Sequence, residues 1–356
     1  MMRGVARAVV VVTLAVALLV ALGLRAGGEH LGVLALLQYL PYPVHLAATA
    51  PALVAGLLLG RGWQVVAVLT AAVVVWPVMG LELPQQEAAE GRTRLRVLTY
   101  NIKSHDAAGA VGGFARLARE IERHDADLIV MQDAGQPSAR RQIEPVSVVA
   151  LLGARPHEML GQYVIASRHP LLGCHANPMP DGVPGEPWVR CTIRVGAQEI
   201  DLYAVHLQTP RAGLDAARRE ALQGLAAWEE NVQTRLAQAE ALAREIAGRQ
   251  RPVILAGDFN APATSLVMRR LRDAGVRDAF GVAGFGYGHT YGQVLRPGVP
   301  FLRIDYILAS PEIGIAHAEV GGSDASPHRP VVADLLLPVA AEDRPVPGER
   351  SARSAP

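Results

Sequence analysis

The chain has 356 residues, of which 50% are hydrophobic and 19% charged, and its formal net charge is +1. This composition excludes an intrinsically disordered chain, a collagen-like repeat and a disulfide-dense secreted scaffold, and the length allows one large domain or two small ones. The average conceals a division within the chain. Residues 1–80 carry five charged side chains, whereas residues 81–356 carry 62, about 22%, which is ordinary for a soluble domain.

Three uncharged apolar runs fill most of the first 80 residues. They cover 8–24, 31–60 and 62–80, and three prolines interrupt the middle run. A helix needs roughly 20 apolar residues to cross the hydrocarbon core of a bilayer. We therefore predict an all-α transmembrane region of about three helices, with a linker, over residues 1–84. In the middle run, 44–60 is the better candidate for a span.

Two other interpretations fit parts of this region. Arg3, Arg7, the first apolar run and the small residues at 26–28 resemble a cleaved signal peptide, but two further apolar runs do not belong to simple secretion. A buried helical core of a soluble protein would show an amphipathic face, and none is visible. We therefore expect a membrane-embedded N-terminus.

The arginines predict an orientation. Arg3 and Arg7 precede the first run and Arg61 lies between the second and third, so the positive-inside rule places all three in the cytoplasm. A multi-pass protein of the cytoplasmic membrane would then carry its soluble domain outside the cytoplasm. In that oxidising compartment Cys174 and Cys191 could pair; the alternative is two buried free thiols.

The soluble part begins with a polar linker at 81–94 and shows strands and helices without regular alternation. The hairpin at 188–208 has period-2 hydrophobicity. These signals favour an α+β arrangement of two mostly antiparallel sheets covered by helices. The predicted strands are 94–102, 126–132, 162–173 (with a turn), 188–195, 199–208, 252–260, 303–310 and 330–337; the predicted helices are 111–124, 212–248 (one helix or two) and 264–274; and a disordered tail is predicted at 341–356.

Polar side chains collect where the predicted strands end. Each alone has an ordinary structural explanation as a turn former, a helix cap or a satisfied core histidine. Together they favour a functional site, because the loops at one edge of a sheet are where sites are built. The set is Asn101, Asp133, His206, Asp258, Asn260, Asp305 and His328.

The set is suited to phosphate chemistry. Mg²⁺ prefers oxygen ligands, which Asn101 and Asp133 can supply together with a substrate phosphate. Asp258 and Asn260, two residues apart on an extended segment, can orient a water and a phosphate. A histidine needs a carboxylate to hold its tautomer, and Asp305 with His328 is the candidate pair.

Six segments carry a resemblance to a known family. LTYNI, VMQD, YAVHL, ILAGDFNAP, RIDYIL and SPHRPV occur in the order and spacing of the endonuclease/exonuclease/phosphatase superfamily, over about 95–337. GDFN followed by RIDYI is the most specific piece. The resemblance implies that 85–340 folds as a four-layer α/β/β/α sandwich. It also implies hydrolysis of phosphoester bonds with Mg²⁺ or Mn²⁺.

The resemblance also implies roles for the site residues. Asn101 and Asp133 take the metal positions, and His206 contacts the scissile phosphate. Asp258 positions or deprotonates the attacking water, and Asn260 holds that water or the phosphate.

In the last block, the resemblance implies that Asp305 orients His328, which acts as general base or phosphate stabiliser. Two departures from the family pattern concern the carboxylates. The metal block usually reads Gln-Glu, whereas Asp133 stands here in place of the glutamate. The usual aspartate before the histidine is replaced by Pro327. Two alternatives follow: Asp324, four residues upstream of His328, folds back to serve instead, or the second metal or phosphate contact is weakened.

The substrate is constrained by the membrane region. The arrangement resembles membrane-anchored bacterial members of the superfamily linked to glycopeptide resistance, and a tether raises the effective concentration of lipid-linked substrates. We therefore predict a phosphoesterase of envelope lipid-linked or small phosphoesters. One alternative is an extracytoplasmic nuclease, although the net charge of −2 over 81–356 argues against nucleic-acid binding. Another is a non-catalytic binding or sensor protein whose site has decayed at Pro327.

Overall fold

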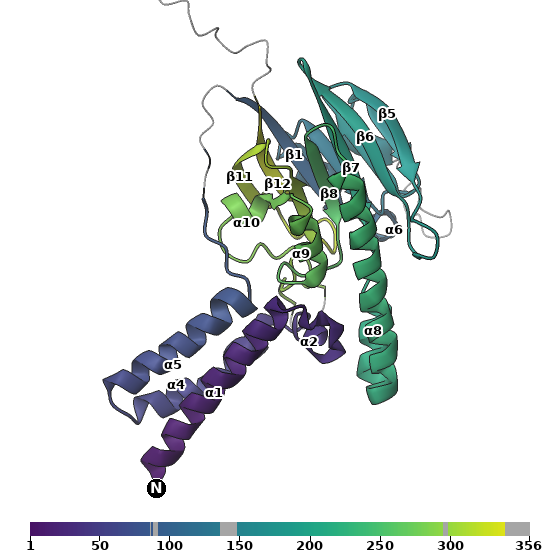
Figure 1. Ribbon diagram of the computed structural model, residues 1–356. Helices are drawn as coiled ribbons and strands as arrows, with labels where there is room; N and C mark the ends of the chain where they lie inside the picture. The colour runs from purple at the N-terminus through teal and green to yellow at the C-terminus, as the bar shows by residue number, and fades with distance from the viewer. Residues whose placement is uncertain (86, 88–91, 136–147, 295–297, 339–356) are drawn as a thin grey trace, which may run out of the picture.

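Two six-stranded sheets lie face to face in the computed structural model, which describes residues 1–85, 87, 92–135, 148–294 and 298–338 (Figure 1). Neighbouring strands are antiparallel except for one parallel pair at the centre of each sheet, β1–β2 and β7–β8. The first sheet has the order β11 (Gly314–Val320), β12 (Val331–Leu337), β1 (Thr93–Asn101), β2 (Leu128–Gln132), β4 (Tyr163–Ser167) and β3 (His157–Leu160). The second has the order β5 (Leu171–Asn177), β6 (Trp188–Val195), β7 (Gln198–His206), β8 (Val253–Asp258), β10 (Asp305–Ala309) and β9 (Arg277–Asp278).

Successive side chains of a strand point to opposite faces of its sheet, so one set packs between the two sheets and the other packs against the covering helices. In β1, Leu95 and Val97 pack between the sheets, whereas Leu98 and Tyr100 face outward. The outward side chains are covered by α7 (Gly113–Glu122), and the second sheet is covered by α8 (Arg211–Ala247) and α9 (Leu266–Asp273). The predicted two-sheet α+β fold is confirmed, with helices on both outer faces. The shorter helices of this part are α6 (Ser104–Ala108), η4 (Val148–Leu152) and α10 (Ala279–Ala283).

The helical segment α8 is folded back on itself. A Cβ added to Gly213 would lie 3.2 Å from the Cα of Trp228, although 15 residues of straight helix span roughly 22 Å. A Cβ at Gly224 would likewise collide with the carbonyl oxygen of Ala216. The segment therefore consists of two helical arms, which decides between the one helix and the two that its sequence allowed.

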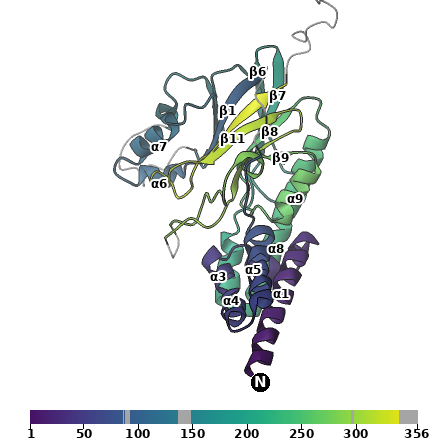
Figure 2. The same ribbon diagram turned by 90° about the vertical axis from the view of Figure 1, so that its left-hand side faces the viewer.

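Three N-terminal helices, α1 (Met2–Arg25), α4 (Ala50–Leu57) and α5 (Arg61–Val73), extend away from the sheets as a bundle, whereas α2 (Gly32–Leu37) packs against α8 (Figures 1 and 2). Two helices, Met2–Arg25 and Arg61–Val78, are long and apolar enough to cross a bilayer, and a third apolar stretch, Tyr42–Leu57, is shorter and divided. A signal sequence or a buried core helix meets the same length criterion, so the three predicted spans stay a prediction. The elements are α1 (Met2–Arg25), η1 (Gly28–His30), α2 (Gly32–Leu37), α3 (Tyr42–Ala47), α4 (Ala50–Leu57), α5 (Arg61–Val73) and η2 (Val74–Val78).

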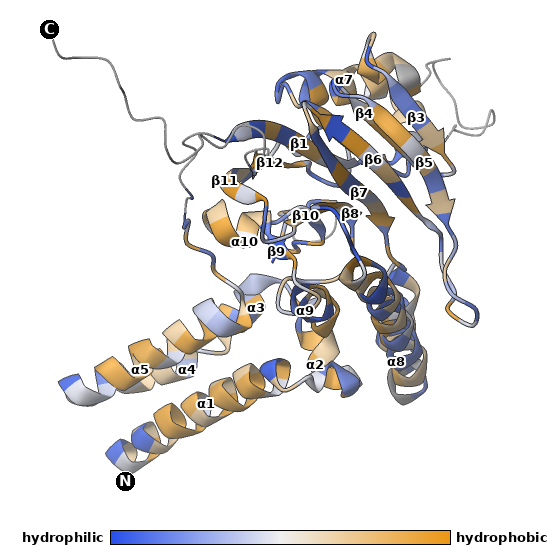
Figure 3. Ribbon diagram, turned by 45° about the horizontal axis from the view of Figure 1, so that its top comes forward, coloured by the Kyte–Doolittle hydropathy of each residue, from blue (hydrophilic) through white to orange (hydrophobic). Residues whose placement is uncertain are grey.

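The bundle buries small side chains and exposes large ones. Its interior contains Ala6, Ala52, Ala55 and Ala67 together with Val10. Large apolar side chains are exposed on its outer surface. In Figure 3, where the ribbon is coloured by hydropathy, long stretches of α1 and α5 are orange. The exposed side chains include Val11, Val12, Leu19, Leu22, Val54, Leu57, Val65, Val68 and Leu69.

Two further features bear on the predicted domain organisation. Cys174 and Cys191 form a disulfide between β5 and β6, rather than remaining free thiols. In the linker, Glu82 forms a backbone bridge with Gly286, so this part is attached to the domain. The tail predicted at 341–356 lies outside the described residues, and the boundaries 1–84 and 85–340 stay predictions.

Candidate active site

Strand alternation brings the predicted residues together. In β8, Ile254 and Ala256 face the other sheet, so Asp258 at the end of the strand faces it too. The same alternation places Asn101 on the inward face of β1, opposite Asp258. His206 and Asp305 lie directly beside Asp258 on the neighbouring strands β7 and β10.

A glycine allows β8 to approach β7 closely at this point. A Cβ on Gly257 would collide with the carbonyl group of Val205 in the paired strand. Because glycine has no Cβ, the two parallel strands can lie close together immediately before Asp258.

Asp258 lies at the centre of the site and contacts three of the other predicted residues. Only 1% of the residue is exposed, and its Oδ2 accepts a hydrogen bond of 3.0 Å from Nδ2 of Asn101 on the opposite sheet. The same oxygen lies 3.6 Å from Nε2 of His206 and 3.8 Å from Nε2 of His328. Burial raises the pKa of Asp258, and the nearby carboxylate of Asp305 raises it further, whereas the two histidines oppose this shift.

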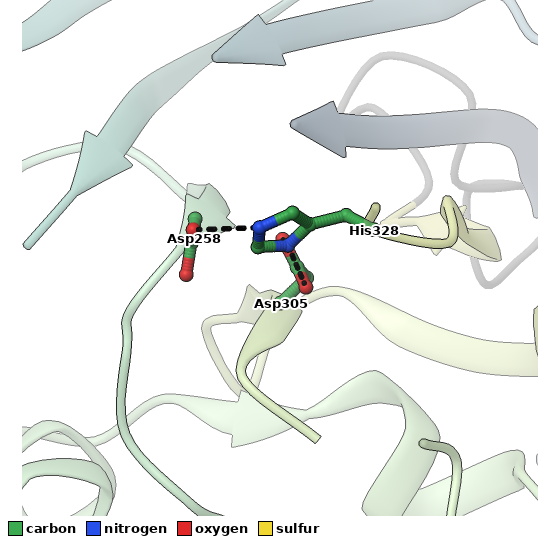
Figure 4. Close-up of side chains that lie close together, drawn as sticks. All are labelled: Asp258, Asp305 and His328. Carbon is green, nitrogen blue, oxygen red and sulfur yellow. Dashed lines mark hydrogen bonds and ion pairs between the residues drawn. The ribbon is translucent and has the colours of Figure 1, made fainter. Parts of the chain in front are cut away.

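His328 bridges two carboxylates, as Figure 4 shows. Its Nδ1 lies 3.0 Å from Oδ2 of Asp305, and its Nε2 faces Asp258. The ring packs on Tyr291, and Ser326 Oγ accepts the backbone N–H of His328. Burial lowers the pKa of His328 to about 4 and raises that of Asp305 to about 7, so the imidazole is neutral at pH 7.

Asp133 follows β2 and lies near the other side of His206. Its Oδ2 forms an ion pair with Lys103, and its Oδ1 is 4.0 Å from Nδ1 of His206. Burial acts to raise the pKa of Asp133, but His206 and Lys103 outweigh it and leave the pKa below its usual value. Asp133 is therefore ionised at neutral pH.

Several residues of the site have a left-handed backbone conformation. Four non-glycine residues in the described part of the chain have positive φ, and three of them are Lys103, Asp133 and Asn260. Such conformations cost on the order of 1–3 kcal/mol and cluster at functional sites. Asn260 is held there by its own Nδ2, which donates to the Leu207 carbonyl, and by its N–H, which donates to Asp258.

The donor groups fit a divalent cation. Ligand atoms of Asp258, Asp305 and His328 lie within 4.8 Å of one another, and all three residues are buried. Asn101 and Asp133 add an amide and a carboxylate oxygen beside them. Buried carboxylates are costly unless a cation compensates them, and Mg²⁺ prefers oxygen ligands of this kind. The identity of the metal and its position among these groups stay predictions.

Of the two alternatives for Pro327, the structure excludes the first, because Asp324 does not fold back toward His328. Asp324 is exposed and accepts a hydrogen bond of 3.4 Å from its neighbour Ser323, because the loop carries it away from the site. The carbonyl oxygen of Pro327 accepts a hydrogen bond from Gln293. The carboxylates that face His328 are Asp258 and Asp305.

Four predicted residues line one cavity of about 430 Å³: His206, Asp258, Asn260 and His328. Asn101 and Asp305 lie directly behind them, through their contacts with Asp258 and His328. Asp133 lines an adjoining cavity of about 390 Å³ that shares His206 and Lys103 with the first. The structure thus assembles all seven predicted residues.

Sequence reasoning missed three residues of the site. Lys103 pairs with Asp133, Gln162 Oε1 lies 2.5 Å from Nδ1 of His206, and Tyr39 lines the larger cavity. Lys103 carried a signal that could have been used, since it is the sole lysine of the chain and follows Asn101 by two positions. Gln162 and Tyr39 carried none.

The geometry defines a phosphoester-hydrolase type of site on a two-sheet α+β fold, and the family comparison agrees. Residues 98–328 match the Endonuclease/Exonuclease/phosphatase family, so the chain belongs to it. Members of this family are hydrolases that act on phosphoesters, generally with a divalent metal. A search of curated proteins found no match.

Solved structures show the same fold. A mannosyl-6-phosphatase from Bacteroides thetaiotaomicron is 16% identical with a TM-score of 0.50, over 68% of this chain and 99% of that one. A humanized D. rerio TDP2 is 16% identical with a TM-score of 0.51, over 68% and 98% of the two chains. At these identities the resemblance shows the fold alone.

Proposed function

We propose that the protein is a membrane-anchored, divalent-metal-dependent phosphoesterase that hydrolyses envelope lipid-linked or small phosphoesters outside the cytoplasm. The observation that carries the catalytic part is the convergence on Asp258 of Asn101 from one sheet and His206 from the other. This arrangement provides a buried carboxylate, a hydrogen-bond donor and an imidazole around one cavity.

We assign each residue of the site a separate role in phosphoester hydrolysis. Asp258 accepts the proton of the attacking water, and its raised pKa makes it a better base than an exposed carboxylate. His206 Nε2 faces the same cavity and contacts the phosphate, while Asn260 orients the water or a phosphate oxygen. Asp305 holds Nδ1 of His328 and so directs its Nε2 toward Asp258.

A divalent cation would be held by Asn101 and Asp133 beside Asp258, which leaves the Asp258 carboxylate free to act as the base. When bound, it supplies positive charge that stabilises the phosphate oxygens.

The N-terminal bundle supports the membrane part of the proposal. Four of the five buried residues where α1, α4 and α5 meet are alanines, and such small residues are typical of helices that pack within a bilayer. Many of the bundle's exposed side chains are large and apolar. Trp76, 57% exposed, lies near the end of the Arg61–Val78 helix, as interfacial tryptophans do. The Cys174–Cys191 disulfide suits an oxidising compartment. The resemblance to anchored members linked to glycopeptide resistance favours a cell-envelope substrate.

Activity assays on the full chain test the catalytic proposal. Purified protein in nanodiscs with Mg²⁺ would be given a phosphodiester, a phosphomonoester and DNA, next to the Asp258→Asn variant. We expect turnover of at least one small ester that Asp258→Asn loses. Equal, negligible rates for both proteins would support a binding or sensor protein instead, and faster cleavage of DNA would support a nuclease.

Localisation is tested separately. We expect the chain to stay in the membrane fraction after alkaline carbonate extraction. A C-terminal reporter that is active only in the cytoplasm should be inactive, and an active one would contradict the proposed orientation.

A further inference from the structure

The segment between the first two apolar helices reaches the catalytic centre. Tyr39 Oη donates a hydrogen bond of 2.9 Å to the carbonyl oxygen of Asn260. Arg235, which is 2% exposed, donates from Nη1 to both Tyr39 Oη and the same carbonyl, at 2.5 and 2.8 Å. The ring of Tyr39 meets that of Trp228 edge to face, at 5.3 Å between centroids. The backbone of the catalytic Asn260 loop is therefore bonded to a residue of the N-terminal region.

The segment is fixed at further points. Trp228 Nε1 donates 2.8 Å to the Gly32 carbonyl, and Glu29, buried, accepts the Leu266 N–H at 2.8 Å at the start of α9. Both contacts precede Tyr39 in the chain; α8 makes one of them and α9 the other. The position of Tyr39 beside the cavity thus follows from several independent buried contacts.

The catalytic cavity is lined by both polar and apolar side chains. Asp258 and His328 are among the polar ones, and the apolar ones, here called the apolar wall, come from Tyr39, α8 and the 301–304 loop. Phe301, Leu302 and Ile304 pack as one cluster against Tyr39 and Tyr291. The apolar wall is made of Tyr39, Leu214, Phe301, Leu302 and Ile304.

The charges of this cavity also suit an amphiphile. Lys103, Arg211 and Arg218 line it together with the carboxylate Asp215, which pairs with Arg218. Cations beside the catalytic centre can bind an anionic head group, while the apolar wall excludes water from what is attached to it. A small polar alcohol attached to the phosphate would leave this wall without a partner.

We propose that the apolar wall is a subsite for an alkyl chain esterified to the phosphate, and that Tyr39 of the N-terminal region is its specificity-determining residue. The inference rests on the proposed function and narrows its substrate to lipid phosphates. Since the wall includes Tyr39, the membrane region is part of the substrate site and does more than tether the enzyme.

Binding of alkyl phosphates tests the subsite without requiring turnover. The full chain in nanodiscs would be titrated calorimetrically with methyl, butyl and hexyl phosphate. We expect affinity to rise up to about fourfold for each buried methylene, until the wall is covered. Tyr39→Ser and Leu214→Ser should flatten this rise. Tyr39→Phe, which keeps the ring, should retain it, and so should Phe285→Ser, a change at an exposed aromatic residue outside this cavity.

The outcomes are distinct from those of the activity assay. Equal affinities for the three phosphates in the unaltered chain would overturn the subsite, whether or not esters are hydrolysed. A rise that survives in Tyr39→Ser would overturn the role of Tyr39. Chain-length-dependent binding without hydrolysis would refute the proposed phosphoesterase and leave the subsite standing.

Discussion

At the scale of single residues, this site differs from a cluster of polar side chains on the surface because its carboxylates are buried. Asp258 and Asp305 are each 1% exposed, and burial raises the pKa of both. Between them, His328 is kept neutral by the same burial. Burial thus brings the pKa of Asp305 to about 7, so this carboxylate takes up and releases a proton near neutral pH.

We expect Asp258→Asn to lower kcat by a factor on the order of 10²–10⁴, because the amide cannot take the proton from water. Steady-state kinetics on a small phosphoester would measure this. Asp324→Asn makes the same chemical change at an exposed carboxylate and should leave kcat within twofold. An equal loss in both variants would contradict the role of Asp258.

The pH profile should respond to Asp305. Asp258 must be ionised to act as a base, so kcat/KM rises with pH through its pKa. Since Asp305 raises that pKa, Asp305→Asn should move the acidic limb of the profile to lower pH, whatever its effect on the maximum. A limb that stays in place or moves to higher pH would show that Asp305 does not act on Asp258 in this way.

At the scale of elements, strand alternation and register assemble the site. His206, Asp258 and Asp305 are direct neighbours on three adjacent strands, and Asn101 faces them from the other sheet. A period-2 pattern was visible in the sequence only in the 188–208 hairpin, which carries His206. The strands β8 and β10 are buried throughout, so the structure alone shows which of their residues face inward. The strands β3 and β9, of four and two residues, were not predicted because so few residues carry too little pattern. The seven-residue strand β11 was also not predicted, and a register shift between Ile315 and His317 interrupts its alternation.

The disulfide between β5 and β6 should matter for stability. Closing a loop of 17 residues is expected to contribute about 3 kcal/mol to the free energy of unfolding. Cys174→Ala with Cys191→Ala should lower the unfolding free energy by roughly that amount in urea titrations. Thiol alkylation of protein isolated without reductant should detect no free thiol, whereas complete alkylation would place the chain in a reducing compartment.

At the scale of the whole molecule, the division of charge corresponds to a division in space. The nearly uncharged first 80 residues form the N-terminal helices, and the charged remainder forms the two-sheet domain (Figure 3). The two parts meet at Glu29 and Tyr39, close to the catalytic loop. The N-terminal apolar region and the candidate active site are thus joined at one place.

Metal binding should stabilise the whole domain. A ligand at 100 times its Kd adds about 2.7 kcal/mol to the free energy of unfolding, which we expect to raise Tm by several degrees. Thermal unfolding of the full chain with Mg²⁺ and with a chelator would measure this, and Asp133→Asn should reduce the shift. Identical Tm values in the unaltered protein would contradict a bound divalent cation.

The sequence by itself determined the fold class, the separate apolar region and the seven polar residues at strand ends, because each leaves a local trace in hydropathy, period or motif. Only the tertiary structure decided the partners: Asn101 with Asp258, Gln162 with His206, and Tyr39 with Asn260. It also showed that Asp324 lies outside the site and that α8 folds back. Tyr39 and Asn260 are 221 positions apart, and no local pattern encodes such a contact; it exists because packing of the N-terminal segment on α8 and α9 brings them together.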